Sequence, residues 1–243
     1  ALTQVIVFET QYSDRRTKEF FQLKERLTEE DVPFSYYSEE AVREFSPDVV
    51  VIVVPYHEMY PTEFWSFVNE KTSIVYIPYG QEIGGGGVNQ TYQFNLLVQN
   101  RAWRVYARSH NHRHMYSRYK DNGSANVVVT GSPRTDLYQN LDGIGNKEVR
   151  EKIGGRIAVL WAPHCSVVKD GEPTAWSSFL YVKDHILEAF ADRSDSHFLI
   201  FRPHPLLWIR LCESGIWSQD EIEEFKSKIR ELGNSCIDEG SNY

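Results

Sequence analysis

The chain has 243 residues, of which 41% are hydrophobic and 25% charged, a composition typical of one large or two ordinary globular domains. Its formal net charge of −8 argues against broad, salt-driven binding to nucleic acid, which needs a basic face, so any anion site must be local. The cysteines are widely spaced and form neither a disulfide framework nor a metal-binding motif, which favours a reducing cytosol.

The first half of the chain alternates between apolar runs and amphipathic segments. Short apolar runs predict strands over residues 5–8, 34–37, 48–54, 73–77, 104–107 and 127–130. Helices are predicted around residues 20–27, 63–68 and 110–120. Such a strand-helix-strand rhythm implies an α/β fold with a parallel sheet and right-handed crossovers.

A polar interval at residues 139–146 is interpreted as the linker between two domains, 1–138 and 139–243. Strands are predicted beyond it over residues 157–161, 198–201 and 235–237. Two helices carry apolar residues on one face, namely Phe179, Val182, Ile186 and Phe190 in one and Ile222, Phe225, Ile229 and Leu232 in the other. Because the chain stops at Tyr243 before a helix can return to the sheet, we expect the second domain to be incomplete in this chain or to be completed by a partner chain.

The most informative stretch follows the strand predicted at 198–201 and reads Arg202-Pro203-His204-Pro205. Pro205 suits the first position of a helix, so a helix is expected over residues 206–212 with its N-terminus facing His204. Strand ends in open α/β sheets are where ligands bind, and a helix N-terminus favours anions. These residues are therefore predicted to bind an anionic substrate. His164 follows the strand at 157–161 in a similar Pro-His loop and is expected on the same edge.

The same residues also have structural interpretations. His204 can be a rigid turn residue that caps a helix, and Arg134 and Asp136 can pair with each other across a turn. His110 and His114 share one face of a predicted helix, but no third ligand completes a metal site there. No metal is therefore expected.

Four short motifs occur in a characteristic order along the chain. They are Pro78-Tyr79-Gly80, residues 130–136 (Thr-Gly-Ser-Pro-Arg-Thr-Asp), residues 160–164 (Leu-Trp-Ala-Pro-His) and residues 201–206 (Phe-Arg-Pro-His-Pro-Leu). In this combination, over about residues 73–210, the sequence resembles the CDP-glycerol glycerophosphotransferases, the teichoic-acid and capsule polymerases of bacteria. The resemblance implies a GT-B glycosyltransferase fold, in which two Rossmann-like domains face a cleft without an obligatory metal.

The resemblance also implies a reaction and its partners. A polyol phosphate, with glycerol phosphate as the first choice, passes from a CDP-activated donor to a hydroxyl of a polymer or lipid-linked acceptor, and CMP is released. Domain 1–138 lies on the acceptor side, domain 139–243 binds the nucleotide donor, and no cofactor is expected. Such an enzyme works in the cytoplasm, and both contact with the inner face of the cell membrane and assembly into a homo-oligomer are compatible with it.

One departure from the family concerns the catalytic base. Polymerases of this family carry His-Gly after the strand equivalent to residues 74–77, whereas this chain has Tyr79-Gly80. The base must take the proton of the acceptor hydroxyl, and His164 is the preferred candidate. The predicted catalytic residues are His164, His204, Tyr79 and Glu82. The predicted substrate-binding residues are Gly80, Arg134, Asp136, Arg202 and Pro205.

Two other functions fit the same pattern. A GT-B glycosyltransferase or a sugar-nucleotide epimerase shares the two-domain cleft and the anion site but acts on a sugar carbon. A non-catalytic binding protein that kept the fold and lost the base is suggested by Tyr79. Turnover of UDP-sugars would identify the first, and binding of CDP-glycerol without release of CMP would identify the second.

Overall fold

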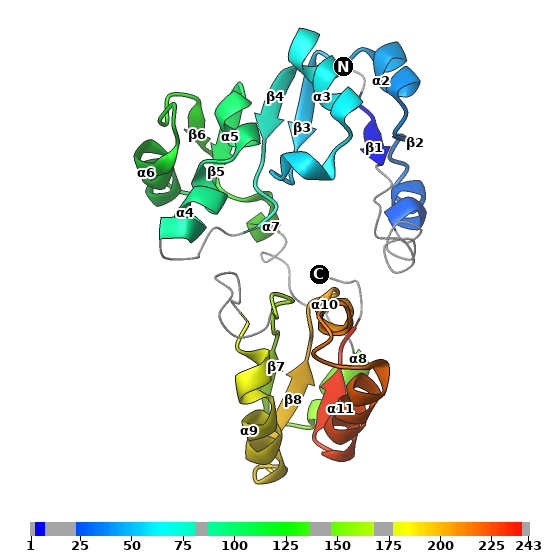
Figure 1. Cartoon of the computed structure of the whole chain (residues 1–243). Helices are drawn as coiled ribbons and strands as arrows, with labels where there is room; N and C mark the ends of the chain where they lie inside the picture. Colours follow the sequence, from blue (N-terminus) through cyan, green and yellow to red (C-terminus); the bar gives the residue numbers. More distant parts are fainter. Residues whose placement is uncertain (1–2, 8–22, 81–86, 137–146, 168–176, 240–243) are drawn as a thin grey trace. The chain divides into compact units, whose positions relative to one another are not determined.

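The computed structural model describes residues 3–7, 23–80, 87–136, 147–167 and 177–239 (Figure 1). The chain divides into two compact units, Ala1–Leu141 and Asp142–Tyr243. Parallel strands form the sheets of both units, with helices between successive strands, so the chain is an α/β protein with a Rossmann-like fold, as the sequence predicted. The predicted boundary between residues 138 and 139 and the predicted linker lie outside the described residues.

The first unit contains two parallel sheets. Strand β1 (Val5–Val7) pairs with β2 (Phe34–Tyr36), and the larger sheet has the order β3 (Val49–Ile52), β4 (Ser73–Tyr76), β5 (Arg104–Ala107) and β6 (Val127–Val129). The sequence predicted all six strands, but it implied a single sheet for this half. The described residues form two sheets because the three-residue strand β1 makes its ladder with β2. Strand β3 is therefore an edge strand, in which Ile52 is 2% exposed and its neighbour Val51 57% exposed.

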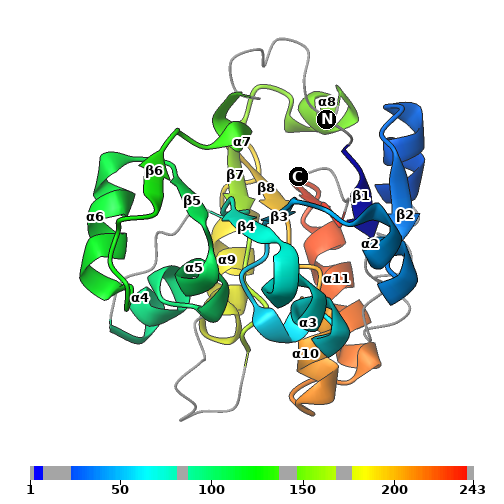
Figure 2. The same cartoon turned by 90° about the horizontal axis from the view of Figure 1, so that it is seen from above.

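Helices of the first unit cover one face of the larger sheet, and Figure 2 shows α3, α4 and α5 along one side of its strands. The helices are α2 (Glu39–Phe45), α3 (Thr62–Lys71), α4 (Gly87–Phe94), α5 (Leu97–Arg101), α6 (His110–Tyr119) and α7 (Pro133–Asp136), with a 3-10 turn η1 (His57–Met59) and a further helical stretch at 23–29. Alternate strand residues such as Ile74 and Val105 meet Trp65, Phe94 and Tyr116 of these helices in one buried cluster. The packing leaves the opposite residues of β3 at the surface.

The second unit is built around β8 (His197–Phe201), which lies between β7 (Ile157–Trp161) and β9 (Ser235–Ile237). Helices α8 (Lys147–Ile153), α9 (Phe179–Ala191), α10 (Leu207–Glu213) and α11 (Gln219–Glu231) surround this sheet (Figure 1). Leu199 and Phe201 of the central strand are fully buried, and each such side chain contributes about 1.5–3 kcal/mol of hydrophobic stabilisation. The sheet is therefore a firm support for the loops that leave its C-terminal edge.

Helix α11 follows from its sequence in detail. Ser218 accepts a hydrogen bond from the Glu221 N–H, and the Glu221 carboxylate accepts one from the Ser218 N–H, which is a complete capping box. Ile222, Phe225 and Ile229, three of the four apolar residues that predicted this helix, are buried in the core of the unit. The helix thus begins directly after its N-cap residue Ser218. Its buried face is the apolar face that the sequence predicted.

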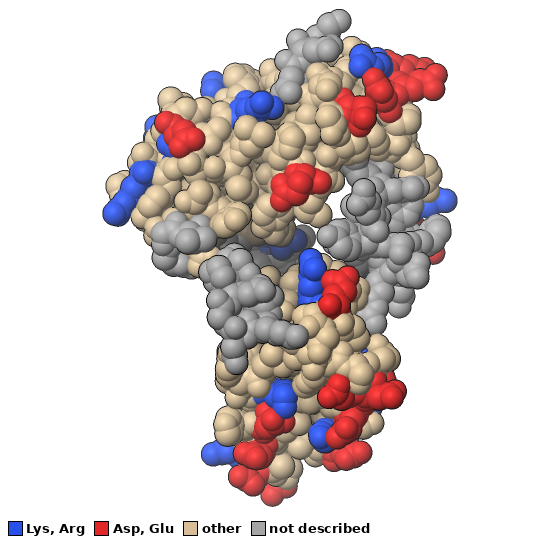
Figure 3. Space-filling view, viewed as in Figure 1, with Lys and Arg blue, Asp and Glu red and all other residues tan. Residues whose placement is uncertain are grey.

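Figure 3 shows the charged residues on one face of the molecule. On the face drawn in Figure 3, Lys and Arg stand singly or beside Asp and Glu, and most of the described surface is uncharged. None of the described helices is long and apolar enough to cross a bilayer. Among the described residues, the face in Figure 3 carries no broad basic patch.

Candidate functional site

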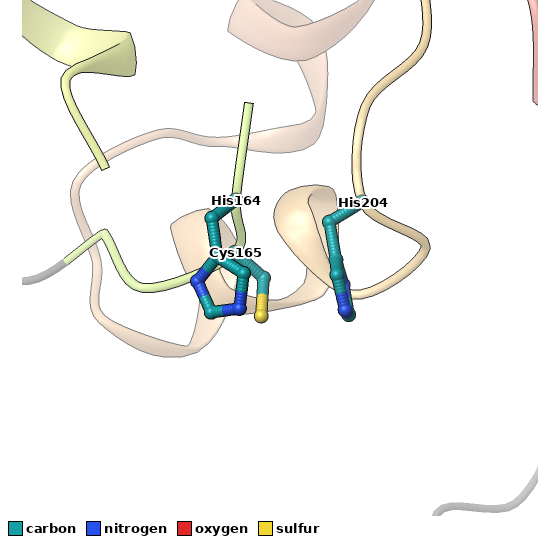
Figure 4. A group of neighbouring side chains, drawn as sticks. All are labelled: His164, Cys165 and His204. Carbon is teal, nitrogen blue, oxygen red and sulfur yellow. The ribbon is translucent and has the colours of Figure 1, made fainter. Parts of the chain in front are cut away.

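The hydrogen-bond ladder between β7 and β8 continues past the ends of both strands. The Arg202 N–H donates to the Trp161 carbonyl at 2.8 Å, and the His204 N–H donates to the Pro163 carbonyl at 3.0 Å. These bonds keep the two Pro-His loops side by side, and the ring centroids of His164 and His204 are 5.1 Å apart. Figure 4 shows both imidazoles extending to the same side, next to Cys165. The two predicted histidines thus meet at the C-terminal edge of the sheet.

Both imidazoles are bonded to the backbone through Nδ1. The Ser166 N–H donates to His164 Nδ1 at 3.1 Å, and the Ser166 hydroxyl lies 2.9 Å from the same nitrogen. The Leu206 N–H donates to His204 Nδ1 at 3.1 Å. In each case the donor comes from two residues further along the chain. The turn that follows each Pro-His pair therefore orients the ring.

The surroundings keep the two imidazoles uncharged. Partial burial lowers the pKa of His164. Burial also lowers the pKa of His204, and the neighbouring His164 lowers it further because two positive charges at this distance repel. At neutral pH both rings are therefore neutral and can offer one N–H donor each.

Cys165 completes a group that has the residue types of a metal site. One ligand atom from each of His164, Cys165 and His204 lies within 4.8 Å of the others. A metal ion, however, needs a lone pair on each imidazole, and the backbone N–H groups already use the lone pairs at Nδ1. Burial also raises the pKa of the Cys165 thiol, which disfavours the thiolate that a metal requires. This set of donors does not fit a bound cation.

Arg202 lies at the same edge but is directed toward β9. Its guanidinium is 3.5 Å from the carboxylate of Asp238, which follows β9, and the Asp238 N–H donates to the Phe201 carbonyl. Arg202 was predicted to hold phosphates, and in that role it would act beside the negative charge of Asp238. The position of this carboxylate depends on the register of β9 with β8, so the sequence did not indicate it.

The turn after His204 differs from the prediction. Helix α10 begins at Leu207, and Leu206 is its N-cap residue, whereas the sequence predicted a helix over 206–212 with unbonded N–H groups facing His204. The Leu206 N–H is bonded to His204 Nδ1 and the Leu207 N–H to the His204 carbonyl. His204 therefore bonds the first two N–H groups after Pro205, those of Leu206 and Leu207, and the helix begins one residue later than predicted.

The other predicted site residues belong to the first unit. Tyr79 and Gly80 follow β4, and the Tyr79 N–H donates to the Val53 carbonyl at 3.2 Å. The Tyr79 side chain is 44% exposed, and its hydroxyl lies 3.5 Å from that of Tyr56, which follows β3. Burial is the main cause that raises the pKa of Tyr56, and the hydrogen bond to Tyr79 is the second. This phenol therefore stays protonated.

Tyr56 is a site candidate that sequence reasoning missed. The signal was present, because Pro55-Tyr56 and Pro78-Tyr79 both follow strands of the same parallel sheet. A Pro-Tyr pair at two neighbouring strand ends predicts two phenols on one edge, as the Pro-His pairs do in the second unit.

A small cavity of about 10 Å³ lies beside Gly80, and residues of the second motif line it, namely Gly131, Ser132 and Pro133. Gly131 has a φ of 90°, which a residue with a side chain rarely adopts, and this explains the glycine in the motif. The cavity has room for about one water molecule.

The remaining predicted residues are not part of this cavity. Arg134 and Asp136 are exposed on α7, and within the described part of the chain no ion pair joins them. Glu82 lies outside the described residues. The structure thus brings His164 together with His204 and Tyr79 together with Tyr56, while Arg134 and Asp136 point to the surface.

Comparisons with known proteins bear on the fold alone. No family model matches the sequence, and no curated protein matches it. Among solved structures, a co-structure of S. aureus MnaA with UDP aligns with 87% of this chain at a TM-score of 0.56 and 13% identity. A glycosyltransferase from Rickettsia africae ESF-5 aligns with 97% of the chain at a TM-score of 0.45 and 10% identity. The chain spans 56% of the first of these proteins and 66% of the second. The likeness to MnaA supports the Rossmann-like α/β fold.

Proposed function

We propose that the chain belongs to a transferase that moves a polyol phosphate, glycerol phosphate first, from a CDP-activated donor to a hydroxyl of a cell-wall or capsule polymer. The acceptor oxygen attacks the β-phosphorus of the donor, and a new P–O ester bond forms. The bond from the β-phosphorus to the bridging oxygen breaks, and CMP leaves with that oxygen. The proton of the acceptor hydroxyl passes to a base.

The observation that carries this proposal is the pair His164 and His204 at one edge of the second sheet. Ligands of open α/β folds bind at the C-terminal ends of the strands, which is where both rings lie. Attack on a nucleotide diphosphate builds negative charge on phosphate oxygens, and fixed N–H donors stabilise that charge. The edge of the sheet that carries His164 and His204 is therefore suited to bind the phosphates of a nucleotide donor.

Further roles follow from the motifs of the family that the sequence resembles. In this proposal Arg202, His204 and the Pro205 turn contact the donor phosphates, and Arg134 and Asp136 contribute to substrate binding. Tyr79 and Gly80 stand on the acceptor side with Glu82, which supplies a carboxylate two residues beyond Gly80. The partners are the CDP-activated polyol and a polymer or lipid-linked acceptor, and the reaction takes place in the cytoplasm, at the inner face of the membrane where the acceptor is lipid-linked.

A second function is favoured by one specific observation. The structure that aligns at a TM-score of 0.56 contains UDP, so a nucleotide-sugar enzyme of the glycosyltransferase or epimerase type is the alternative. Its reaction would occur at a sugar carbon and not at phosphorus. The same histidine pair could serve a UDP-linked donor, because the diphosphate is common to both substrates.

An assay of nucleotide release distinguishes these functions. Purified protein is incubated with an acceptor and, in turn, CDP-glycerol, CDP-ribitol and a set of UDP-sugars. The proposal expects CMP from a CDP-polyol and no turnover of UDP-sugars. Turnover of a UDP-sugar with inert CDP-polyols would establish the alternative, and tight binding of CDP-glycerol without CMP release would indicate a non-catalytic binding protein.

A further inference from the structure

We infer that His164 and His204 are fixed as neutral Nε2–H tautomers and act as a pair of hydrogen-bond donors to a phosphate group of the nucleotide. The inference rests on the proposed function for the identity of the ligand. Both rings were predicted as catalytic residues, with His164 as the preferred base. Their hydrogen bonds assign His164 a different task at this site and give His204 the means to contact the donor phosphates as a hydrogen-bond donor.

The argument for His204 starts from the backbone. An amide N–H can only donate, so the bond from the Leu206 N–H requires a lone pair on His204 Nδ1. A neutral imidazole carries one proton, which must then sit on Nε2. The His204 N–H and carbonyl are bonded to the Pro163 carbonyl and the Leu207 N–H, so the turn that sets this tautomer is itself anchored at both sides.

His164 has the same arrangement. The Ser166 N–H requires a lone pair on His164 Nδ1, and the Ser166 hydroxyl can donate a second hydrogen bond to that nitrogen. The single proton of the neutral ring is again on Nε2. In both loops the backbone N–H two residues further on sets the tautomer, so both rings carry their proton on Nε2 for the same reason.

Two matched donors on one edge favour an anion. The rings lie 5.1 Å apart and extend to the same side in Figure 4, so both can donate to oxygens of one phosphate or of two linked phosphates. Hydrogen bonds from fixed donors to a charged oxygen are about twice as strong as those between neutral groups. A general base or a metal ligand would instead need a lone pair at Nε2, which this tautomer lacks.

The inference changes the path of the acceptor proton. If His164 and His204 each hold a proton at Nε2, the base that accepts the hydroxyl proton is a different residue. Of the other predicted catalytic residues, Glu82 is then the first candidate, because carboxylic acids as a class have reference pKa values well below neutral pH and phenols have values well above it. The histidine pair stabilises the phosphate charge that moves onto CMP as it leaves.

The tautomers can be measured directly. Two-bond 1H–15N correlation spectra of the purified protein at pH 7.5 distinguish protonated from unprotonated ring nitrogens. We expect Nε2 to be protonated and Nδ1 unprotonated in both His164 and His204. A protonated Nδ1 in either ring would overturn the inference.

Binding by matched variants tests the donor role. Asparagine at position 204 can accept the Leu206 N–H through its side-chain oxygen, as in an Asx turn, but has no group at the place of Nε2. Glutamine can place an N–H donor near that position. We expect His204→Asn to weaken binding of inorganic phosphate and CDP about 10- to 100-fold, the effect of one hydrogen bond to a charged group, and His204→Gln to weaken it only a few-fold.

The exposed His185 on α9 provides a control, and His185→Asn should leave both affinities unchanged. Circular dichroism and thermal unfolding confirm that each variant is folded. If folded His204→Asn binds phosphate and CDP as tightly as the unsubstituted protein, the donor role is wrong. A stronger loss in His204→Gln than in His204→Asn would contradict it as well.

A titration with Zn²⁺ tests the metal-site alternative. We expect no stoichiometric binding of Zn²⁺ that depends on Cys165. Tight 1:1 binding that is lost in both Cys165→Ser and His204→Asn would replace the phosphate site with a metal site. These measurements need no polyol donor, so the two proposals can fail separately. Absence of CMP release would reject the proposed reaction but not the phosphate-binding role of His164 and His204. Absence of phosphate binding would reject that role but not the proposed reaction.

Discussion

The rings of His164 and His204 lie 5.1 Å apart, and each accepts at Nδ1 the N–H of the residue two positions further along the chain. The two rings are brought together by the parallel pairing of β7 and β8, and each is oriented by the backbone N–H that its Nδ1 accepts. Position and tautomer therefore have separate causes, one in the sheet and one in the loops. A substitution can therefore alter the hydrogen-bonding groups at these positions without altering the sheet that places them.

The pH dependence of stability follows from the lowered pKa values of the pair. In the unfolded chain both histidines titrate near 6.5, and in the folded chain they titrate lower. Below about pH 6.5 the unfolded state binds protons that the folded state does not, so the free energy of unfolding falls as the pH is lowered through this window. Above it, the two groups contribute a constant amount.

Urea unfolding at pH 7.5 and pH 5.5 measures this effect. The double variant His164→Asn/His204→Asn should lose less stability between the two pH values than the unsubstituted protein. Cys165, whose sulfur lies within 4.8 Å of a ring nitrogen of each histidine, stays a neutral thiol over this range and does not contribute. An equal loss in both proteins would show that the pair is not responsible.

The ion pair between Arg202 and Asp238 limits the positive charge available at the site. Asp238→Asn removes a negative charge 3.5 Å from the guanidinium, so binding of CDP should become a few-fold tighter. The two side chains are 24% and 35% exposed, and such a pair contributes at most about 1 kcal/mol to folding. Isothermal titration with CDP checks the affinity, and Glu213→Gln, which breaks the exposed pair with Arg210, is the control. Weaker binding in Asp238→Asn would mean that Asp238 positions Arg202 for the phosphate.

The cap of α11 is predicted to carry measurable stability. Ser218→Ala removes the acceptor for the Glu221 N–H and the hydroxyl bond to the Glu221 carboxylate, while the backbone half of the capping box remains, so the free energy of unfolding should fall by about 1 kcal/mol. Gln219→Ala, one position further on, is the matched control and should have little effect. Chemical denaturation of both variants decides the comparison. Equal stabilities would show that the helix start is fixed by packing of Ile222 alone.

The strands and the buried helix faces could be predicted from the sequence because their period is local. Strands β5, β7 and β9 have the predicted bounds, since each is a short apolar run ended by polar or turn residues. Helix α2 was not predicted, although Ser38 caps it and Glu39 and Glu40 fill its first turn. Its single buried residue, Val42, gives no helical period from which to recognise it.

The candidate site could be predicted in position but not in chemistry. The order of the motifs indicated that His164 and His204 lie at strand ends, because parallel neighbours end on the same edge. The bonds at Nδ1 depend on the two-residue turns after each Pro-His pair, and the partner of Arg202 depends on how β9 pairs with β8. These contacts come from backbone geometry and strand register, neither of which leaves a pattern in the sequence.

Turnover by His164→Gln separates a donor from a base. Glutamine can donate a hydrogen bond near the position of Nε2 but cannot accept a proton at neutral pH, whereas loss of a true base lowers kcat about 10²- to 10⁴-fold. If His164 is a donor, His164→Gln should retain kcat within about tenfold, the cost of one imperfect hydrogen bond, while Glu82→Gln should show the larger loss with an unchanged affinity for CDP. Tyr79→Phe removes only the hydroxyl that faces Tyr56 and should have a smaller effect than Glu82→Gln. CMP release at saturating donor measures all three. A loss of 10²-fold or more in His164→Gln, with CDP still bound and with Glu82→Gln fully active, would restore His164 as the base and reject its assignment as a donor.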